Sequence, residues 1–324
     1  PQGLLGVKES DLLRHIYARS ASLTSRSMHV VVGPGDDCAV LRSSSGDLQL
    51  ITVDQLIEGR HFRAGTAVDR IARKIVARSV SDIAAMGGSP TWGLATGALP
   101  TDFAHADKLF DAMARWADHF GCPLVGGDIA SLGSGSTKSA IVVDGEPVNE
   151  SRMVLTCTVA GTPHSRRGPV LRSTAQPGDE VWVTGRLGGS FESGRHLTFE
   201  PRVREGYWLC DHLGENLHAM IDLSDGLGRD AGRVAAASGV RIEIQGPRLP
   251  VHQNVHSWEA AIGDGEDYEL CFTVAAGSLK LTACPLTGTP LTHIGYVRSG
   301  EGCVLLDETG VPTEISNEGW DHGE

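Results

Sequence analysis

Long hydrophobic runs are missing from this sequence. It contains no stretch of about 18 consecutive apolar residues, the length that a membrane-spanning helix requires. Its first residues also lack the basic segment followed by an apolar segment that marks an exported protein. We therefore expect no membrane insertion and a cytoplasmic location.

Paired cysteines and excess positive charge are missing as well. The seven cysteines are spread along the chain and include no CxxC pair, which argues against a disulfide framework and against a zinc site. We expect them to be reduced and buried. With 40 Asp and Glu against 28 Lys and Arg, the net charge is -12, which disfavours nucleic acid as a partner. Acidic clusters that bind metal ions would add to this excess.

The common nucleotide-binding signatures do not occur. The sequence has no GxxxxGKS/T loop, no GxGxxG motif after an expected strand, and no HRD-type kinase motif. Kinases of the common types are therefore excluded. A Gly-rich run at 184–190 follows an expected strand, but a plain turn explains it equally well.

What is present indicates two domains. A chain of 324 residues with 40% hydrophobic content suits two domains of roughly 150 residues each. We place the boundary in the Gly/Pro/Arg segment 161–168, which gives an N-terminal domain, 1–163, and a C-terminal domain, 164–324. Helical periodicity and short apolar runs in both halves predict an α/β (α+β) fold. Helices are expected at 9–19, 69–86, 104–119 and 227–238, and strands at 30–32, 39–41, 48–53, 92–99, 123–125, 140–143, 153–160 and 181–184.

Aspartates beside Gly or Ser recur where apolar runs end, so we expect them on loops at strand ends. The groups are Gly35-Asp36-Asp37, Thr52-Val53-Asp54, Ser81-Asp82, Gly126-Gly127-Asp128 and Asp222-Leu223-Ser224-Asp225-Gly226. Magnesium prefers hard oxygen ligands and usually takes few protein carboxylates, the rest being water and substrate phosphate. Phosphoryl transfer between two polyanions uses such ions. Any one of these aspartates could simply form a turn, but together they favour a metal-dependent enzyme.

Taken in order, these motifs resemble those of the thiamine-monophosphate kinases, a family in the ATP-binding superfamily of aminoimidazole ribonucleotide synthetase. The similarity covers nearly the whole chain. It is carried by GPGDDCAVL (33–41), TVDQLIEGRHF (52–62), SVSDIAAMGGSP (79–90), PLVGGD (123–128), RSTAQPGDEVWVTGRLGGS (172–190), AMIDLSDGLGRDAGRVAAASGV (219–240), GDGEDYELCFTV (263–274) and EGWDH (318–322). GEDYEL with the terminal aromatic-Asp-His indicates the thiamine branch. Val53 stands where the family usually has Thr, and Ser79 where it usually has Asn.

The resemblance implies a two-domain PurM-like fold, in which the N-terminal sheet closes a barrel with its copy in a homodimer and the C-terminal half is a second α/β domain. It implies ATP in a groove between the domains and phosphorylation of thiamine monophosphate to thiamine diphosphate by direct in-line transfer with several Mg²⁺ ions. Two alternatives stay open. One is another ATP-dependent enzyme of the superfamily, of the hydrogenase-maturation or selenophosphate-synthetase type. The other is a non-catalytic nucleotide-binding relative.

The resemblance also implies roles for single residues. The implied metal ligands are Asp37, Thr52, Val53, Asp54, Asp82, Asp128, Asp222 and Asp225, with Asp54, Asp128 and Asp225 catalytic. The implied ATP contacts are Gly127, Asp128, Arg172 and Ser224, and the implied acceptor contacts are His61, Glu266 and Trp320. Side-chain chemistry agrees, because an arginine is a planar fork for phosphate and Trp320 could stack on a cationic thiazolium ring. The alternatives are a packing role for Trp320, a structural role for His61 and a surface salt bridge for Arg172.

Overall fold

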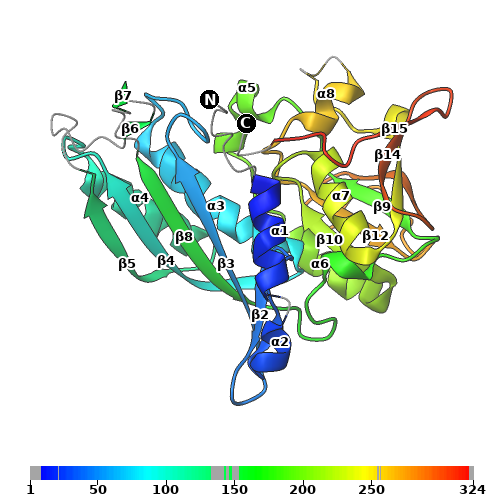
Figure 1. Ribbon diagram of the computed structural model, residues 1–324, viewed down its shortest axis with the longest axis horizontal. Helices are drawn as coiled ribbons and strands as arrows, with labels where there is room; N and C mark the ends of the chain where they lie inside the picture. The colour runs from blue at the N-terminus through cyan, green and yellow to red at the C-terminus, as the bar shows by residue number, and fades with distance from the viewer. Residues whose placement is uncertain are drawn as a thin grey trace.

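Two β-sheets divide the chain into two halves. The computed structural model describes residues 9–20, 22–132, 142–143, 146–147, 153–253, 255 and 257–320. Figure 1 shows the six-stranded sheet on the left and the seven-stranded sheet on the right, each with its own helices. This mixture of helices and strands in both halves confirms the predicted α/β (α+β) fold class.

The N-terminal half builds the six-stranded sheet, in the order β1-β2-β3-β8-β4-β5, and β4 and β5 are its parallel pair. Its strands are β1 (Val30–Val32), β2 (Ala39–Arg42), β3 (Leu48–Ile57), β4 (Ser89–Leu99), β5 (Leu124–Ser131) and β8 (Val154–Thr162). The short strands β6 (Val142–Val143) and β7 (Glu146–Pro147) pair separately. The helices of this half are α1 (Glu9–Ser20), α2 (Leu23–Arg26), α3 (Val68–Ala85) and α4 (Ala106–His119).

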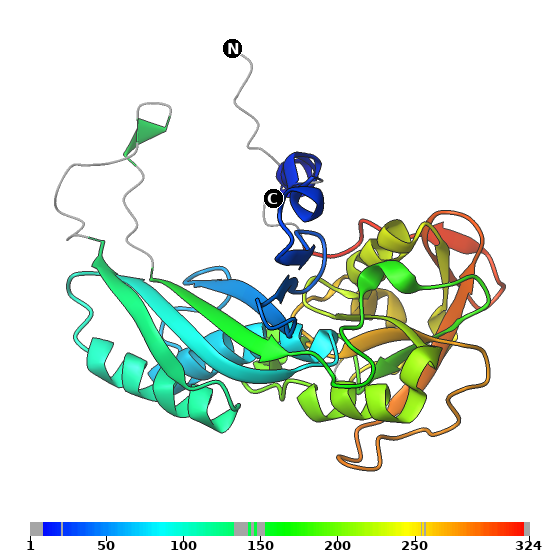
Figure 2. The ribbon, with the colours of Figure 1, turned by 90° about the horizontal axis from the view of Figure 1, so that it is seen from below.

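Helices α3 and α4 cover one face of the six-stranded sheet, as Figure 2 shows. Apolar residues recur at helical spacing along α3, and Ile75, Val80 and Ile83 are fully buried there. The helix ends before Gly87, which has a φ of +67°. The Cβ of any other residue at this position would lie 2.3 Å from the Cys210 sulfur. Only glycine fits that position, so the predicted stop of this helix is confirmed.

Among the described residues, no helix packs on the other face of this sheet and no strand pairs with the outer edge of β5. Val53 on the outer face is 62% exposed, and Val125 and Ile129 on β5 are 66% and 63% exposed. Exposed apolar residues beside an unpaired strand edge are typical of an interface. The predicted homodimer would bury this region, and it stays a prediction.

The C-terminal half builds the seven-stranded sheet, in the order β10-β12-β9-β13-β11-β14-β15. Its strands are β9 (Glu180–Thr184), β10 (Leu217–Asp222), β11 (Arg241–Gln245), β12 (Leu270–Val274), β13 (Leu291–Arg298), β14 (Gly302–Leu306) and β15 (Pro312–Glu314). Its α-helices are α5 (Ser190–Ser193), α6 (Val203–Leu213), α7 (Leu227–Ser238) and α8 (Trp258–Gly263), and its 3-10 helices are η1 (Arg172–Thr174), η2 (Arg195–Leu197), η3 (Gly214–Asn216) and η4 (Gly246–Arg248).

Two cores sandwich the seven-stranded sheet, because successive side chains of a strand point to opposite faces. On β9, Val181 and Val183 pack in the same core as Ala231 of α7. Trp182, between them, packs in the core that contains Leu209 of α6. Helices α7 and α6 therefore lie on opposite faces of this sheet.

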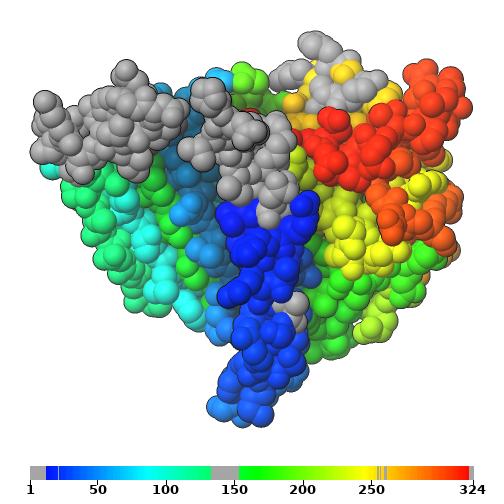
Figure 3. Space-filling model, in the orientation of Figure 1, coloured from blue at the N-terminus to red at the C-terminus, as the bar shows by residue number. Residues whose placement is uncertain are grey.

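Helix α3 joins the two halves. It packs against β3, β8 and α4 in its own half and against α6 and β10 in the other. The backbones of α3 and α6 meet closely, because a Cβ on Gly206 would lie 2.5 Å from the carbonyl oxygen of Ala84. On the face that Figure 3 shows, α1 and α2 (blue) lie along the junction of the halves.

Several expectations can be checked against this architecture. All seven cysteines are buried and free, as predicted. The first sheet ends at Thr162 and the second begins at Glu180, although the domain boundary at 163/164 stays a prediction. Residues 140, 141, Asp321 and His322 lie outside the described residues. Among the described helices, none combines the length and the apolar character that crossing a membrane would need.

Candidate active site

Three aspartates from distant parts of the chain meet where the two halves join. Asp37 lies in the turn before β2, Asp82 in α3 and Asp222 at the end of β10. One carboxylate oxygen of each lies within 4.8 Å of the others. Asp37 and Asp222 are buried and Asp82 is partly buried. We call these three residues the aspartate cluster.

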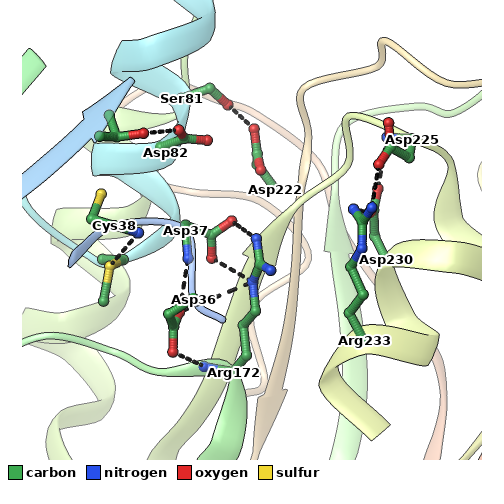
Figure 4. A network of polar contacts seen from close by, with 12 residues as sticks. Asp36, Asp37, Cys38, Ser81, Asp82, Arg172, Asp222, Asp225, Asp230 and Arg233 are labelled. Atoms are coloured by element: carbon green, nitrogen blue, oxygen red, sulfur yellow. Dashed lines mark hydrogen bonds and ion pairs between the residues drawn. The ribbon is translucent and has the colours of Figure 1, made fainter. Parts of the chain in front are cut away.

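Hydroxyl groups orient two carboxylates of the cluster. Figure 4 labels one such pair, Ser81 and Asp222. Thr52 Oγ1 donates a hydrogen bond to Asp82, and Ser81 Oγ donates to Asp222 Oδ2 at 2.6 Å. Burial, and then the charge of Asp54, raise the pKa of Asp82 well above its ordinary value. Burial, reinforced by Asp37, also raises the pKa of Asp222. A cation at this position would oppose both shifts, because it favours the ionised carboxylates.

Arg172 contacts one side of the cluster. Its Nε and Nη2 donate to the two oxygens of Asp37 at 3.1 and 2.5 Å, and its backbone N–H donates to Asp36 Oδ2 at 3.1 Å (Figure 4). Burial, together with the charge of Asp37, raises the pKa of Asp36 to about 7. The Arg172 side chain is only 14% exposed, so this is a buried bidentate pair and not a surface salt bridge. Its contact with ATP stays a prediction.

Asp225 lies on the loop that follows β10, and this loop is held in place. Arg233 Nη2 lies 2.6 Å from Asp225 Oδ2, and Nη1 of the same arginine lies 2.7 Å from Asp230 Oδ1 (Figure 4). The backbone N–H groups of Asp225 and Gly226 donate to Asp230 Oδ2 at 3.0 and 3.2 Å. The loop is therefore a rigid support for Ser224 and Asp225.

A pocket with a volume of about 250 Å³ opens beside this loop. Ser224 and Asp225 line it, and so do His61, Glu266 and Trp320. The last three are the residues expected to contact the acceptor, and they come from opposite ends of the chain. The fold brings them to one cavity next to the loop that continues from Asp222.

Glu266 lines the pocket and has three basic neighbours, of which Arg78 also lines the pocket. Lys74 Nζ donates to its Oε2, His196 Nδ1 lies 3.1 Å from the same oxygen, and Arg78 Nη1 lies 3.9 Å from its Oε1. Burial alone would raise the pKa of Glu266, but the hydrogen bond with His196 and the charges of Lys74 and Arg78 lower it to about 2. Glu266 is therefore a fixed negative charge. Lys74 is fully buried, and that burial lowers its pKa to about 8 in spite of Glu266.

The segment that carries Glu266 is conformationally strained and clamps the Gly-rich run. Glu266 has a φ of 65°, which is uncommon for a residue with a side chain. Beside it, Asp267 Oδ2 accepts a hydrogen bond from Gly188 N and Asp264 Oδ2 accepts one from Gly189 N, both at 2.8 Å. These backbone N–H groups are already used by carboxylates, which favours the interpretation of 184–190 as a turn and not as a phosphate loop.

His61 and Trp320 are fixed through different groups. His61 is buried, and its Nδ1 accepts a hydrogen bond from the Ile57 N–H at 2.9 Å. In a neutral ring the proton then sits on Nε2. Trp320 donates its backbone N–H to the Asp225 carbonyl at 2.8 Å, while the residue stays 50% exposed. The backbone is anchored and much of the residue remains accessible to a ligand, but the stacking role stays a prediction.

The expectation that the aspartates lie on loops is wrong for three of them. Asp54 lies within β3, Asp82 in the interior of α3 and Asp128 within β5. Strand alternation explains Asp54: Thr52 and Asp54 point to the covered face, and Val53 between them points outward. A strand can thus present two polar side chains without ending. Val53 can offer only its backbone carbonyl, so its role as a metal ligand stays a prediction.

Gly127 and Asp128 do not join the aspartate cluster within one chain. Strand register places Asp54 and Gly127 in one row across β3, β8, β4 and β5, three strand spacings or about 14 Å apart. Asp128 is the next residue, so its side chain points to the opposite face, where it is exposed. The roles of both in binding ATP and metal stay predictions.

Comparison with known proteins fits this geometry. The family described as AIR synthase related protein, N-terminal domain, matches residues 35–146. Thiamine-monophosphate kinase of Rhodopirellula baltica is 33% identical, with 98% of each chain covered. The chain belongs to the thiamine-monophosphate kinase family. The enzyme of that name from Bacillus subtilis is 31% identical, over 93% of this chain and 97% of its own. Among solved structures, AaThiL complexed with AMPPCP and TMP is 28% identical, has a TM-score of 0.75, and covers 98% of this chain and 97% of its own.

Within the thiamine-monophosphate kinase family, the two departures of this chain leave the aspartate cluster intact. Val53 points away from it, as described above. Ser79 is buried behind the cluster, where its Oγ donates to the Cys157 carbonyl at 2.9 Å. Neither side chain contacts Asp37, Asp82 or Asp222, so neither departure changes the carboxylates of the cluster.

Sequence reasoning missed three basic residues around Glu266, of which Arg78 also lines the pocket. Lys74 and Arg78 carry a signal that could have found them, since they precede Asp82 by eight and four residues on one helix and so share a face with it. His196 carries no such signal. It lies in η2, far from Glu266 in the sequence, and only the fold brings the two together.

Proposed function

We propose that the protein transfers the γ-phosphoryl group of ATP to thiamine monophosphate and forms thiamine diphosphate. One observation carries the proposal: His61, Glu266 and Trp320 line a single pocket beside Asp225. Membership of a kinase family over the full chain supports the reaction. Similarity to AaThiL, which was solved with AMPPCP and TMP, supports the pair of substrates.

The aspartate cluster fits magnesium. Asp37, Asp82 and Asp222 offer carboxylate oxygens within 4.8 Å of one another, and hard oxygen donors are the ligands that this ion prefers. Asp54 and Asp225 are further candidates, because the charge of Asp54 bears on Asp82 and Asp225 follows Asp222 on one loop. Magnesium bound here would offset the repulsion between the phosphates of the two substrates.

The residues of the pocket act by positioning. Glu266, held ionised by its neighbours, attracts the cationic ring of the acceptor, and the exposed part of Trp320 is available to stack on it. The acceptor phosphate is already ionised, so its oxygen can attack the γ-phosphorus without a general base. Alignment and fixed charge then supply the catalysis.

Turnover assays test the proposal. With ATP, magnesium and thiamine monophosphate, we expect ADP and thiamine diphosphate in equal amounts, measured by chromatography. Free thiamine should be a poor acceptor, and a chelator should stop the reaction. ADP release without thiamine diphosphate, or product only with a different acceptor, would contradict the assigned substrate.

The direct in-line step can be tested separately. ATP made chiral at the γ-phosphorus should give thiamine diphosphate with inverted configuration at that phosphorus, because one displacement inverts the centre. Retention would require two displacements and therefore a phosphorylated enzyme intermediate, which would overturn the direct mechanism while leaving the substrates unchanged.

We also propose that the protein is a homodimer that buries the open face and β5 edge of the N-terminal sheet. The exposed apolar residues Val53, Val125 and Ile129 support it. The protein should sediment as a dimer at micromolar concentration. Ile129→Lys should shift it toward the monomer, and a wild-type protein that sediments as a monomer would remove the proposal.

A further inference from the structure

Arg78 lies between the two acidic regions of the site. It is in α3, its side chain is 11% exposed, and it lines the pocket beside Glu266. Its Nη2 donates to Asp54 Oδ1 at 3.3 Å, and its Nη1 lies 3.9 Å from Glu266 Oε1. The guanidinium therefore bridges an expected metal ligand and an expected acceptor contact.

The hydrogen-bonding capacity of Arg78 is only partly used. Among the described residues, its buried Nε and Nη1 atoms have no hydrogen-bond acceptor. Buried polar groups in folded proteins are nearly always hydrogen-bonded, because an unmatched donor destabilises the fold. A guanidinium presents its donors as a rigid planar fork that matches phosphate and carboxylate oxygens. An anion with such oxygens is the ligand that would match these donors.

The charges around the pocket show which part of a ligand belongs there. Glu266 and Arg78 place a negative and a positive group side by side on one wall. Thiamine monophosphate carries a cationic ring and an anionic phosphate. With the ring near Glu266 and Trp320, the phosphate is directed toward Arg78, on the side where Asp54 lies.

We propose that Arg78 binds the phosphate of the acceptor and holds it for attack on ATP. This inference rests on the proposed function. In the step itself, an oxygen of the acceptor phosphate forms the bond to the γ-phosphorus while the bond from that phosphorus to the departing ADP oxygen breaks. Arg78 keeps all its protons and orients the attacking oxygen by hydrogen bonds.

A binding comparison with two ligands separates this role from a structural one. Thiamine monophosphate and thiamine differ by the phosphate, and their affinities can be measured by calorimetry on wild-type protein and on Arg78→Met. We expect Arg78→Met to weaken thiamine monophosphate about 10- to 100-fold, the range for a hydrogen bond to a charged group. Its affinity for thiamine should change little. Equal weakening of both ligands would overturn the proposal.

Arg73 provides a matched control on the same helix. It is buried to a similar extent, and its Nη1 also has no hydrogen-bond acceptor among the described residues. Its Nη2 donates to Glu200 at 3.0 Å, and it is not among the residues that line the pocket. Arg73→Met should leave the ratio of the two affinities unchanged. A change in that ratio as large as for Arg78→Met would also count against the proposal.

If Arg78→Met does not fold, Arg78→Lys can be measured in its place, because lysine keeps the positive charge but lacks the planar fork. Its affinity for thiamine monophosphate should fall by less than the roughly 10- to 100-fold expected for Arg78→Met. Its affinity for thiamine should change little. An unchanged ratio in Arg78→Lys would then overturn the proposal. Wild-type protein that neither binds nor phosphorylates thiamine monophosphate would instead contradict the proposed function.

Discussion

The aspartate cluster and the Glu266 region both contain buried carboxylates, yet they are built in opposite ways. In the cluster, several carboxylates lie together and Arg172 pairs with one of them. At Glu266, a single carboxylate is surrounded by Lys74, Arg78 and His196. Burial raises the pKa values of Asp82 and Asp222, whereas the hydrogen bond with His196 and the charges of Lys74 and Arg78 lower that of Glu266 to about 2. The cluster has more carboxylates than positive charges, which suits metal ions, whereas the carboxylate of Glu266 is already paired with basic side chains of the protein.

The largest expected effect comes from removing the charge of Glu266. Glu266→Gln leaves Lys74 and Arg78 buried without their shared anion, so the free energy of unfolding should fall by about 3 to 5 kcal/mol, the range for losing one partner of a buried ion pair. Urea denaturation measures it. The control is Glu200→Gln, because Glu200 is 60% exposed in its pair with Arg73 and should matter by less than about 1 kcal/mol. Similar small losses for both variants would contradict the comparison.

The pH dependence of stability tests the burial of Lys74 in the same region. The pKa of Lys74 falls from 10.5 to about 8 in the folded protein. Between these values the unfolded chain binds more protons, so stability should rise as pH increases from 8 to 10.5, by up to about 3 kcal/mol. Other groups also titrate there, so the measurement is the difference between wild type and Lys74→Met. Parallel pH profiles for the two proteins would show that Lys74 is not responsible.

Breaking the aspartate cluster should cost activity and not stability. Asp222→Asn removes a charge from a group of mutually repelling carboxylates, so metal-free protein at neutral pH should be at least as stable as wild type. Its kcat should fall about 10²-fold, equivalent to about 2.7 kcal/mol, and half-maximal rate should need more magnesium. Asp179→Asn is the control: Asp179 is equally buried but pairs with His218 at 2.8 Å. It should lose stability and keep its magnesium dependence.

The smallest expected effect comes from replacing Trp320 at the edge of the pocket. Trp320→Ala should raise the KM for thiamine monophosphate about 2- to 30-fold, the range for a cation–π contact worth about 0.5 to 2 kcal/mol, and leave the KM for ATP unchanged. Steady-state kinetics with each substrate varied in turn measures this. A drop in melting temperature with both KM values unchanged would favour a packing role for Trp320.

The local sequence pattern was sufficient to predict the bounds of a helix that has glycine at both ends. Helix α7 begins and ends where the sequence predicted, because Gly226 and Gly239 stand at its two ends and Gly239 adopts a left-handed conformation. The same reasoning failed for β5. Gly126 and Gly127 were expected to end the strand, but pairing with β4 carries it on to Ser131. Backbone pairing with a neighbour is a tertiary effect that glycine content does not reveal.

The residues of the candidate site likewise include some that were predicted and some that were not. Family resemblance pointed to His61, Glu266 and Trp320, and the fold does bring them to one pocket, although no local pattern connects them. The partners that set the charge of Glu266 were not predicted. In the sequence Lys74 is one polar residue of an expected helix, and only the structure shows that it is fully buried. Burial of this kind depends on how the two halves meet.

The spacing of Lys74, Arg78 and Asp82 along α3 has a consequence for how this chain can change over evolution. An α-helix turns about 100° per residue, so one residue inserted between Arg78 and Asp82 would swing Asp82 away from Asp37 and Asp222, while Arg78 stayed at the pocket. Substitutions in this stretch change one contact at a time. A change of length would separate the pocket from the aspartate cluster in a single step, so the number of residues between these positions of α3 is constrained.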